Sequence, residues 1–215
     1  RRTEALIMPQ LVLLGDGILA NGKHTNKEPD TAATIREQLR GWTVTLLAGE
    51  GSAMAAVPAQ LQRMPANPDL VVLSVGGNDA MEHTDLLQQP AKSSGETLDA
   101  LIAMVDGFTQ KYDALVQSVR GRAPRLVLCT IYEPPLVGKN TASRARVLVT
   151  LLNDRILRAA YRTGSDVLDL RAICTGPDDF RMQIEPSASG AAKIGRAIAA
   201  IAGGGEGRRI TVIAG

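Results

Sequence analysis

The sequence predicts a three-layer α/β/α fold in which helices cover both faces of a doubly wound, parallel, five-stranded sheet. Short apolar runs alternate with helical patterns from one end of the chain to the other, and this alternation is typical of such folds. The runs are rich in valine and leucine, as expected for strands that are buried on both faces. The length of 215 residues suits one core, so a single domain is expected over residues 1–215.

Five runs carry the strand signal, because each is short, apolar and bounded by turn residues. The expected strands are Gln10–Leu14, Trp42–Leu47, Leu70–Val75, Arg125–Ile131 and Ser165–Leu170. A further β-prone segment, Ile210–Ile213, follows a glycine-rich stretch and could pair at a sheet edge.

Helical periodicity fills the segments between these strands. Asp30, Ser52 and Thr97 precede the first three helices and are residue types that cap helix N-termini. Pro58 lies inside the second helix and should kink or shorten it. The apolar residues of the fourth helix are interpreted as core. The expected helices are Thr31–Arg40, Ala53–Met64, Leu98–Arg120, Ala142–Arg162 and Ala188–Ala202.

Charge and cysteine content narrow the classes of function. The 24 basic and 22 acidic side chains are scattered, so no basic stripe favours nucleic acid as a partner. Cys129 and Cys174 lack metal-ligand spacing and form no disulfide framework, so we expect free thiols, no metal and no cofactor. Leu11–Leu14 is too short to span a membrane, which predicts a soluble protein, cytoplasmic or exported with its leader removed.

Function in a doubly wound sheet gathers in the loops that leave the carboxyl ends of the strands. Glycine and polar residues recur in these loops and in the segment before the last helix. The four segments, in chain order, are Gly15–Leu19 (GDGIL), Gly49–Ser52 (GEGS), Gly76–Asp79 (GGND) and Glu185–Gly190 (EPSASG).

Together these segments resemble the four sequence blocks of the SGNH (GDSL) hydrolases, which are a G-D-S-[LI] turn, a glycine loop, G-x-N-D, and D-x-x-H-P before the last helix. The resemblance covers nearly the whole chain, and Gly76–Asp79 is its most specific part. It implies the flavodoxin-like strand order 2-1-3-4-5. It also implies a small-molecule ligand such as an acyl ester, a thioester or an acetylated sugar.

The resemblance places Gly17 where the family keeps its nucleophilic serine, Glu185 where it keeps the histidine base and Met182 where it keeps the orienting aspartate. Serine hydrolysis uses the hydroxyl, the imidazole and the carboxylate as one unit. The joint loss of all three is chemically coherent, because the base and its partner serve nothing without the nucleophile. The chain is therefore expected to be inactive or impaired as a serine esterase.

The resemblance also implies a retained oxyanion hole, formed by the backbone N–H groups of Gly17 and Gly51 and the side-chain amide of Asn78. An ionised Glu185 facing this hole would repel a carboxylate, so a neutral carbonyl, a hydroxyl or a cationic amine is the easier guest. Alternatively, Glu185 is exposed and solvated. Further residues expected to line the site are Asp16, Ser52, Gly77, Asp79 and Tyr132.

Several residues leave a different chemistry open. His24 or His83 could be a relocated base, although a loop histidine is more often solvated. Ser52 could be a displaced nucleophile, although helix capping is its commoner role, and Ser187 and Ser189 could cap the last helix.

The carboxylates near the missing serine admit two roles. Asp16, Asp79 and Glu185 could cluster to activate a water or hold a divalent metal, but their spacing carries no metal signature, and bracing of loops is the expected role of the two aspartates. Three functions thus remain open: ligand binding by an inactive protein, ester hydrolysis by non-standard residues, and a structural or interaction role. The oligomeric state leaves no signal in the sequence.

Overall fold

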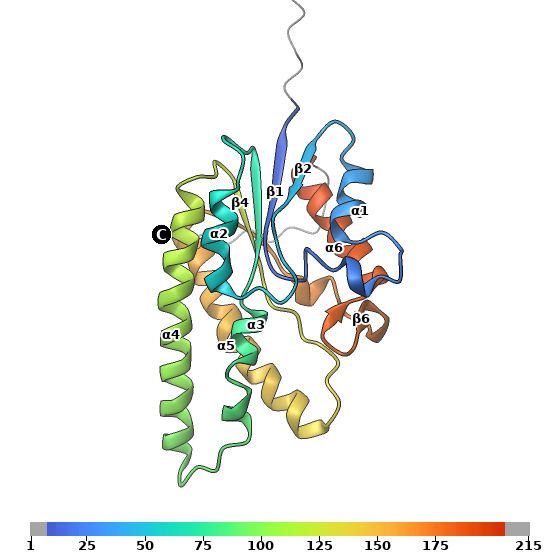
Figure 1. The fold of residues 1–215 in the computed structure, drawn as a ribbon. Helices are drawn as coiled ribbons and strands as arrows, with labels where there is room; N and C mark the ends of the chain where they lie inside the picture. Colours follow the sequence, from blue (N-terminus) through green and yellow to red (C-terminus); the bar gives the residue numbers. More distant parts are fainter. Residues whose placement is uncertain (1–7, 205–215) are drawn as a thin grey trace, which may run out of the picture.

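The computed structural model describes residues 8–204 and contains a five-stranded parallel sheet in the order β2-β1-β3-β4-β5, which confirms the expected fold and strand order (Figure 1). β1 pairs with β2 on one side and with β3 on the other. The winding therefore changes direction at β1, and ligands of doubly wound folds bind at this point. The strands are β1 Gln10–Gly15, β2 Thr43–Leu46, β3 Leu70–Ser74, β4 Leu126–Cys129 and β5 Asp166–Leu168.

Helices cover both faces of the sheet (Figure 1). The helices α2, α4 and α5 pack on one face, whereas α1 and α6 pack on the other and contact each other closely. A short helix, α3, follows β3 at the edge where the strands end. The helices are α1 Thr31–Gln38, α2 Val57–Gln62, α3 Gly77–Met81, α4 Ser94–Arg120, α5 Lys139–Thr163 and α6 Ala188–Ala202.

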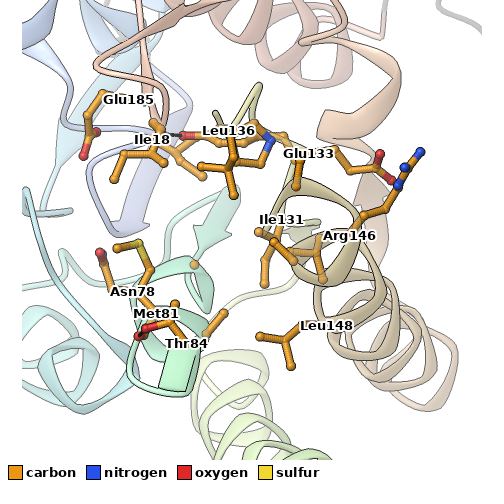
Figure 2. A pocket seen from close by; sticks show the side chains of 18 of the residues that line it. Ile18, Asn78, Met81, Thr84, Ile131, Glu133, Leu136, Arg146, Leu148 and Glu185 are labelled. Carbon is orange, nitrogen blue, oxygen red and sulfur yellow. Dashed lines mark hydrogen bonds between the residues drawn. The ribbon is translucent and has the colours of Figure 1, made fainter. Parts of the chain in front are cut away.

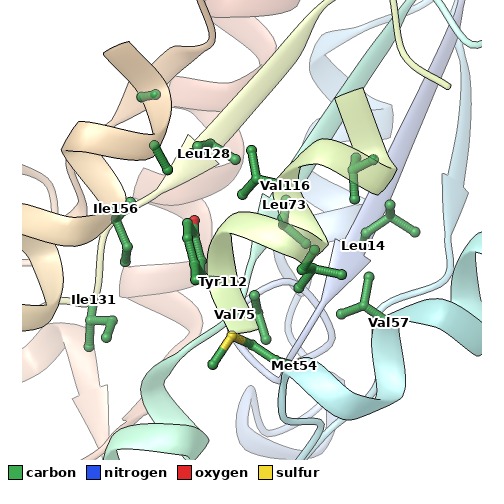
Figure 3. Close-up of a cluster of buried hydrophobic side chains, with 14 of the residues drawn as sticks. Leu14, Met54, Val57, Leu73, Val75, Tyr112, Val116, Leu128, Ile131 and Ile156 are labelled. Carbon is green, nitrogen blue, oxygen red and sulfur yellow. The ribbon is translucent and has the colours of Figure 1, made fainter. Parts of the chain in front are cut away.

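Alternating strand residues fill two separate cores. In β1, Val12 and Leu14 face α2 and α4, whereas Leu11 and Leu13 face α1 and α6, and all four side chains are fully buried. Figure 3 shows the first core, in which Tyr112 of α4 packs among aliphatic side chains from the sheet and from α5. Burial on both faces explains why the three central strands, β1, β3 and β4, have continuous apolar sequences.

Two expected helix starts are wrong because other residues provide the caps. The helix expected at Ala53–Met64 is divided into a 3₁₀ turn, Met54–Ala56, and α2, in whose first turn Pro58 is tolerated. Ser52 caps neither of them. The helix expected from Leu98 begins at Ser94, where Ser93 accepts the Glu96 N–H, so Thr97 is not its cap. Asp30 caps α1 as expected.

Several small elements were not expected from the sequence, among them three 3₁₀ turns at Gly22–His24, Leu170–Ala172 and Pro177–Asp179 and three elements near the ends of the strands. The latter three are α3, a 3₁₀ turn at Thr84–Leu87, and a two-stranded antiparallel hairpin of β6 Phe180–Arg181 and β7 Glu185–Pro186. The segment Ile210–Ile213 lies outside the described residues. Among residues 8–204, no helix has the length and apolar character needed to cross a membrane.

Candidate functional site

A pocket of about 420 Å³ opens at the carboxyl ends of β1, β3 and β4, and its size is typical of small-molecule sites. Its walls come from the loops after these strands, from α3 and from the first turns of α5 (Figure 2). Gly17, Gly51 and Asn78 all line it. The three residues that the sequence nominates as donors therefore line one cavity.

Two buried side-chain amides hold the strand ends from which the site loops leave. The Gln60 side chain accepts the Gly15 N–H at 2.7 Å and donates to the Gly15 carbonyl oxygen at 2.9 Å. The Asn153 side chain makes the same two-way pairing with the backbone of Ile131, at 2.7 and 2.8 Å. At these strand ends the side-chain amides form hydrogen bonds of the kind that a neighbouring strand forms inside the sheet. The loops after β1 and β4 therefore start from fixed points.

The turn after β1 requires glycine at position 15. Gly15 has a φ of 117°, and a Cβ there would lie 1.7 Å from the Ser74 carbonyl oxygen. The next residue, Asp16, is buried and accepts hydrogen bonds from the Ile18 N–H and the Ser74 hydroxyl, each at 3.1 Å. Asp16 thus lines the pocket and also braces the turn that presents Gly17.

Gly17, in contrast, is not required by the backbone, since its φ lies outside the left-handed region. A Cβ built at Gly17 would lie 3.4 Å from Glu185 Oε2 and 3.7 Å from the Cα atom of Glu50. These are close to ordinary van der Waals separations. A serine would therefore fit at this position, and the Glu185 carboxylate lies beside the place of its side chain.

Glu185 is held in place through both of its neighbours in the chain. The Tyr132 hydroxyl donates to the Ile184 carbonyl oxygen at 2.5 Å, and the Asn21 amide donates to the Pro186 carbonyl oxygen at 3.1 Å. The Glu185 side chain is 28% exposed and lines the pocket, which answers the question left open by the sequence.

The third glycine-containing loop braces the second. One N–H of the Asn78 side-chain amide donates to the Ser52 carbonyl oxygen at 2.9 Å, and the amide has a second hydrogen. The Asp79 carboxylate accepts the Met54 N–H at 3.1 Å. Asp79 thereby caps the 3₁₀ turn at Met54–Ala56, a role that was expected of Ser52. Asp79 is a loop brace, and neither it nor Ser52 is part of the pocket lining.

His24 is the histidine that approaches the site. Its Nε2 atom lies 3.1 Å from Glu50 Oε1 and 3.9 Å from Glu185 Oε2, and Lys23 also binds Glu50. His83 lies at the start of a 3₁₀ turn and does not line the pocket. The structure therefore leaves His24 as the one histidine of the described residues that is near Glu185.

Other residues singled out in the sequence lie away from the pocket. Met182 is 76% exposed, has a φ of 49° in the β6–β7 turn and does not line the cavity. Ser187 caps α6 by accepting the Gly190 N–H, as expected. Ser189 is not a cap, because its hydroxyl donates to the buried carboxylate of Asp179, which also binds Lys193.

The main feature that the sequence did not predict is the apolar character of the pocket. Beyond Gly17 and Asn78, the cavity continues between aliphatic side chains of α3, of the segment after β4 and of α5 (Figure 2). In α5, Ala142, Ala145 and Val149 face it at helical spacing. The core expected in this helix included Leu148, which lines the cavity, and Val147, which is exposed, because a core and an apolar cavity leave the same pattern in a helix.

Burial sets the electrostatics of this end of the pocket. It raises the pKa of Asp16 to about 7, and the negative charges of Glu185 and Asp79 act in the same direction, against the hydrogen bonds from Ile18 and Ser74. Burial also raises the pKa of Asp79. Within residues 8–204, no group of three or more histidine, cysteine or acidic side chains is arranged to hold a metal ion.

Comparisons with known proteins identify the family of the chain. The sequence model of the GDSL-like lipase/acylhydrolase family matches residues 13–193. No curated protein sequence matches the chain.

Solved structures share the fold at low sequence identity. An extracellular lipase from Streptomyces rimosus has a TM-score of 0.70 at 17% identity, over 90% of this chain and 99% of that chain. A phospholipase A1 from Streptomyces albidoflavus has a TM-score of 0.68 at 17% identity, over 91% and 99% of the two chains. An acetylxylan esterase from Geobacillus stearothermophilus has a TM-score of 0.61 at 17% identity, over 88% and 92%. With a family match over most of its length and this fold, the chain belongs to the GDSL-like lipase/acylhydrolase family, the SGNH hydrolases.

Proposed function

We propose that this chain binds a ligand with an apolar chain and a carbonyl or hydroxyl oxygen, and that it does not act as a serine esterase. The observation that carries this proposal is the pairing of Gly17 with Glu185. The position that presents the nucleophile in the family has no side chain, and a carboxylate lies beside it in place of an imidazole. The ligand would be held by the apolar walls of the pocket.

The polar end of the pocket supports binding of an oxygen atom. Gly17, Gly51 and Asn78 line the same cavity, and the Asn78 amide has one hydrogen beyond the one that binds Ser52, so their N–H groups are the donors that we propose for the oxygen. Such donors, fixed before the ligand arrives, lose little freedom on binding. The apolar part of the ligand contributes through burial of hydrocarbon, about 0.8 kcal/mol per CH₂ group. A hydrocarbon chain therefore fits the pocket better than a sugar does.

Two measurements test this proposal together. We expect no burst and no serine-type turnover of p-nitrophenyl butyrate or p-nitrophenyl octanoate, and no covalent labelling by an alkyl phosphonate. We also expect saturable binding of 2-undecanone, a neutral ketone with an apolar chain, measured by titration calorimetry. Phosphonate-sensitive turnover, or no detectable ketone binding, would refute the proposal.

A second candidate function is ester hydrolysis in which Glu185 activates a water molecule. It is favoured by the anchoring of Glu185 through Tyr132 and Asn21, since a fixed base needs no reorganisation. Water would attack the ester carbonyl carbon while Glu185 takes its proton. The tetrahedral intermediate would then expel the alkoxide, which takes that proton and leaves as the alcohol.

This second function predicts a different set of results. Turnover of p-nitrophenyl octanoate would be insensitive to the phosphonate and would be lost in Glu185→Gln. The matched control is Glu133→Gln, which removes a carboxylate from the other end of the same pocket (Figure 2). Equal loss in both variants, or no turnover in the unmodified chain, would exclude Glu185 as a base.

A further inference from the structure

The charges around the pocket are unequally placed. Asp16, Glu185 and Glu133 line the cavity, and Arg146 is the basic residue of its lining. Figure 2 shows Arg146 beside Glu133, at the end opposite to Glu185. The end that holds Gly17 and Asn78 therefore contains carboxyl groups and no guanidinium or ammonium group of the pocket lining.

The Glu185 carboxylate, which is only 28% exposed, lacks the hydrogen-bond donors that a partly buried carboxylate usually has. No hydrogen bond to it is made within residues 8–204, and its one basic neighbour there within 4 Å is His24, at 3.9 Å. The Nε2 atom of His24 is closer to Glu50, at 3.1 Å, and Lys23 is bound to Glu50 as well. Both bases at this edge are thus directed to Glu50, and Glu185 keeps its hydrogen-bonding capacity for a ligand.

From this arrangement we infer that the ligand is a single-chain amphiphile with a cationic amine head. The ammonium donates to Glu185, and the hydrocarbon chain occupies the apolar part of the pocket between α3 and α5. An ammonium group desolvated at the end of an apolar cavity needs a charged acceptor, and Glu185 is the one positioned there. This inference rests on the binding function proposed above and adds the sign of the charge on the ligand.

The backbone donors of the pocket do not reverse this preference. The N–H groups of Gly17 and Gly51 favour an anionic oxygen, but they are dipoles, whereas Glu185 is a full charge at the same end of the cavity. A fatty-acid anion would gain the donors and lose more through repulsion by Glu185. A hydroxyl group next to the amine could use the donors and the carboxylate at once.

The test compares three ligands with the same decyl chain. Decyltrimethylammonium cannot donate a hydrogen bond, so decylamine is the cation of choice, with decanol as the neutral and decanoate as the anionic ligand. Binding is measured by titration calorimetry at pH 7 and below the concentrations at which the ligands form micelles. We expect decylamine to bind about tenfold or more tightly than decanol, and decanoate to bind most weakly.

Two variants identify the group responsible. Glu185→Gln should reduce the preference for decylamine over decanol to near unity. Glu133→Gln, at the other end of the pocket, should keep the preference. Circular dichroism of both variants shows whether they are folded.

The outcomes separate this inference from the function on which it rests. Equal binding of decylamine and decanol, or tighter binding of decanoate, would overturn the inference and leave the binding function standing. Binding of none of the three ligands would overturn both. A preference for decylamine that survives in Glu185→Gln would also overturn the assignment, because the charge would then be recognised elsewhere.

Discussion

The Oε2 atom of Glu185 lies 3.4 Å from the point at which a side chain at Gly17 would begin. The two residues come from opposite ends of the chain and meet because β1 and the β6–β7 hairpin reach the same edge of the sheet. Their proximity brings together the two positions that the motif resemblance assigns to the family's nucleophile and base, although neither carries the expected residue. The following predictions test what this arrangement does and what holds it.

The first prediction concerns restored chemistry. Gly17→Ser combined with Glu185→His should produce hydrolysis of p-nitrophenyl butyrate that an alkyl phosphonate abolishes, because the serine Cβ fits and the imidazole replaces the nearby carboxylate. Adding Met182→Asp should give little further gain, since Met182 is exposed and outside the pocket. Steady-state kinetics measure both effects. A folded double variant without phosphonate-sensitive turnover would show that the two side chains do not form a working pair.

The second prediction concerns the anchor of Glu185. Tyr132→Phe removes the hydroxyl that binds the Ile184 carbonyl oxygen and keeps the edge-to-face packing of the ring on Phe180, with ring centroids 5.0 Å apart. We expect a loss of about 1 kcal/mol in the free energy of unfolding and weaker binding of decylamine. Urea denaturation and calorimetry measure the two quantities. Unchanged binding would mean that Glu185 is held without this bond.

The third prediction concerns a buried hydroxyl that has no partner. The Tyr112 hydroxyl, in the core between α4 and the sheet, forms no hydrogen bond within the described residues. Tyr112→Phe should therefore raise the free energy of unfolding by about 1 kcal/mol, the opposite of the effect at Tyr132. The two variants delete the same atom type from buried rings, so each serves as the control of the other. A loss of stability in Tyr112→Phe would show that the hydroxyl has a partner after all.

The fourth prediction concerns pH. The pKa of Asp16 is about 7 in the folded chain and near 4 when unfolded, so between these pH values the folded state holds a proton that the unfolded state releases. This contribution to stability is present below about pH 4 and is lost as pH rises to about 7, at up to about 1.4 kcal/mol per pH unit. Asp16→Asn cannot titrate. Its stability relative to the unmodified chain should therefore increase from pH 5 to pH 8 in urea denaturation, and a constant difference would contradict the pKa.

The sequence predicted the layers, the strands and the helices of the sheet because buried parallel strands and amphipathic helices leave separable periodicities. The strand order did not follow from periodicity and came from the resemblance of the loops to a family. The start of α4 was missed although Ser93 and Glu96 carry the serine-glutamate spacing of a capping box, with the Glu96 carboxylate accepting the Lys92 N–H. This error was avoidable.

The site was predictable only in part. Motif order nominates Gly17, Gly51 and Asn78, and all three line one cavity because the carboxyl ends of parallel strands meet at one edge. Whether Glu185 faces the cavity depends on two hydrogen bonds to its neighbours, from Tyr132 and Asn21, and no local pattern encodes such long-range bonds. The apolar walls were hidden for a different reason, since a residue facing a cavity and a residue facing the core have the same helical spacing.

The paired amides of Gln60 and Asn153 have a consequence for protein engineering. Each amide lies on a helix and binds the backbone at the end of a strand, but neither Gln60 nor Asn153 lines the pocket. The loops therefore start from fixed points that do not depend on which side chains the loops carry. A new side chain could be installed at Gly17 while the Gln60 clamp keeps the start of its loop fixed, and one at Glu185 while Tyr132 and Asn21 hold the neighbouring backbone. The chain therefore suits the design of a catalyst, because a pocket with mainly apolar walls lies beside the place where the reacting groups would go.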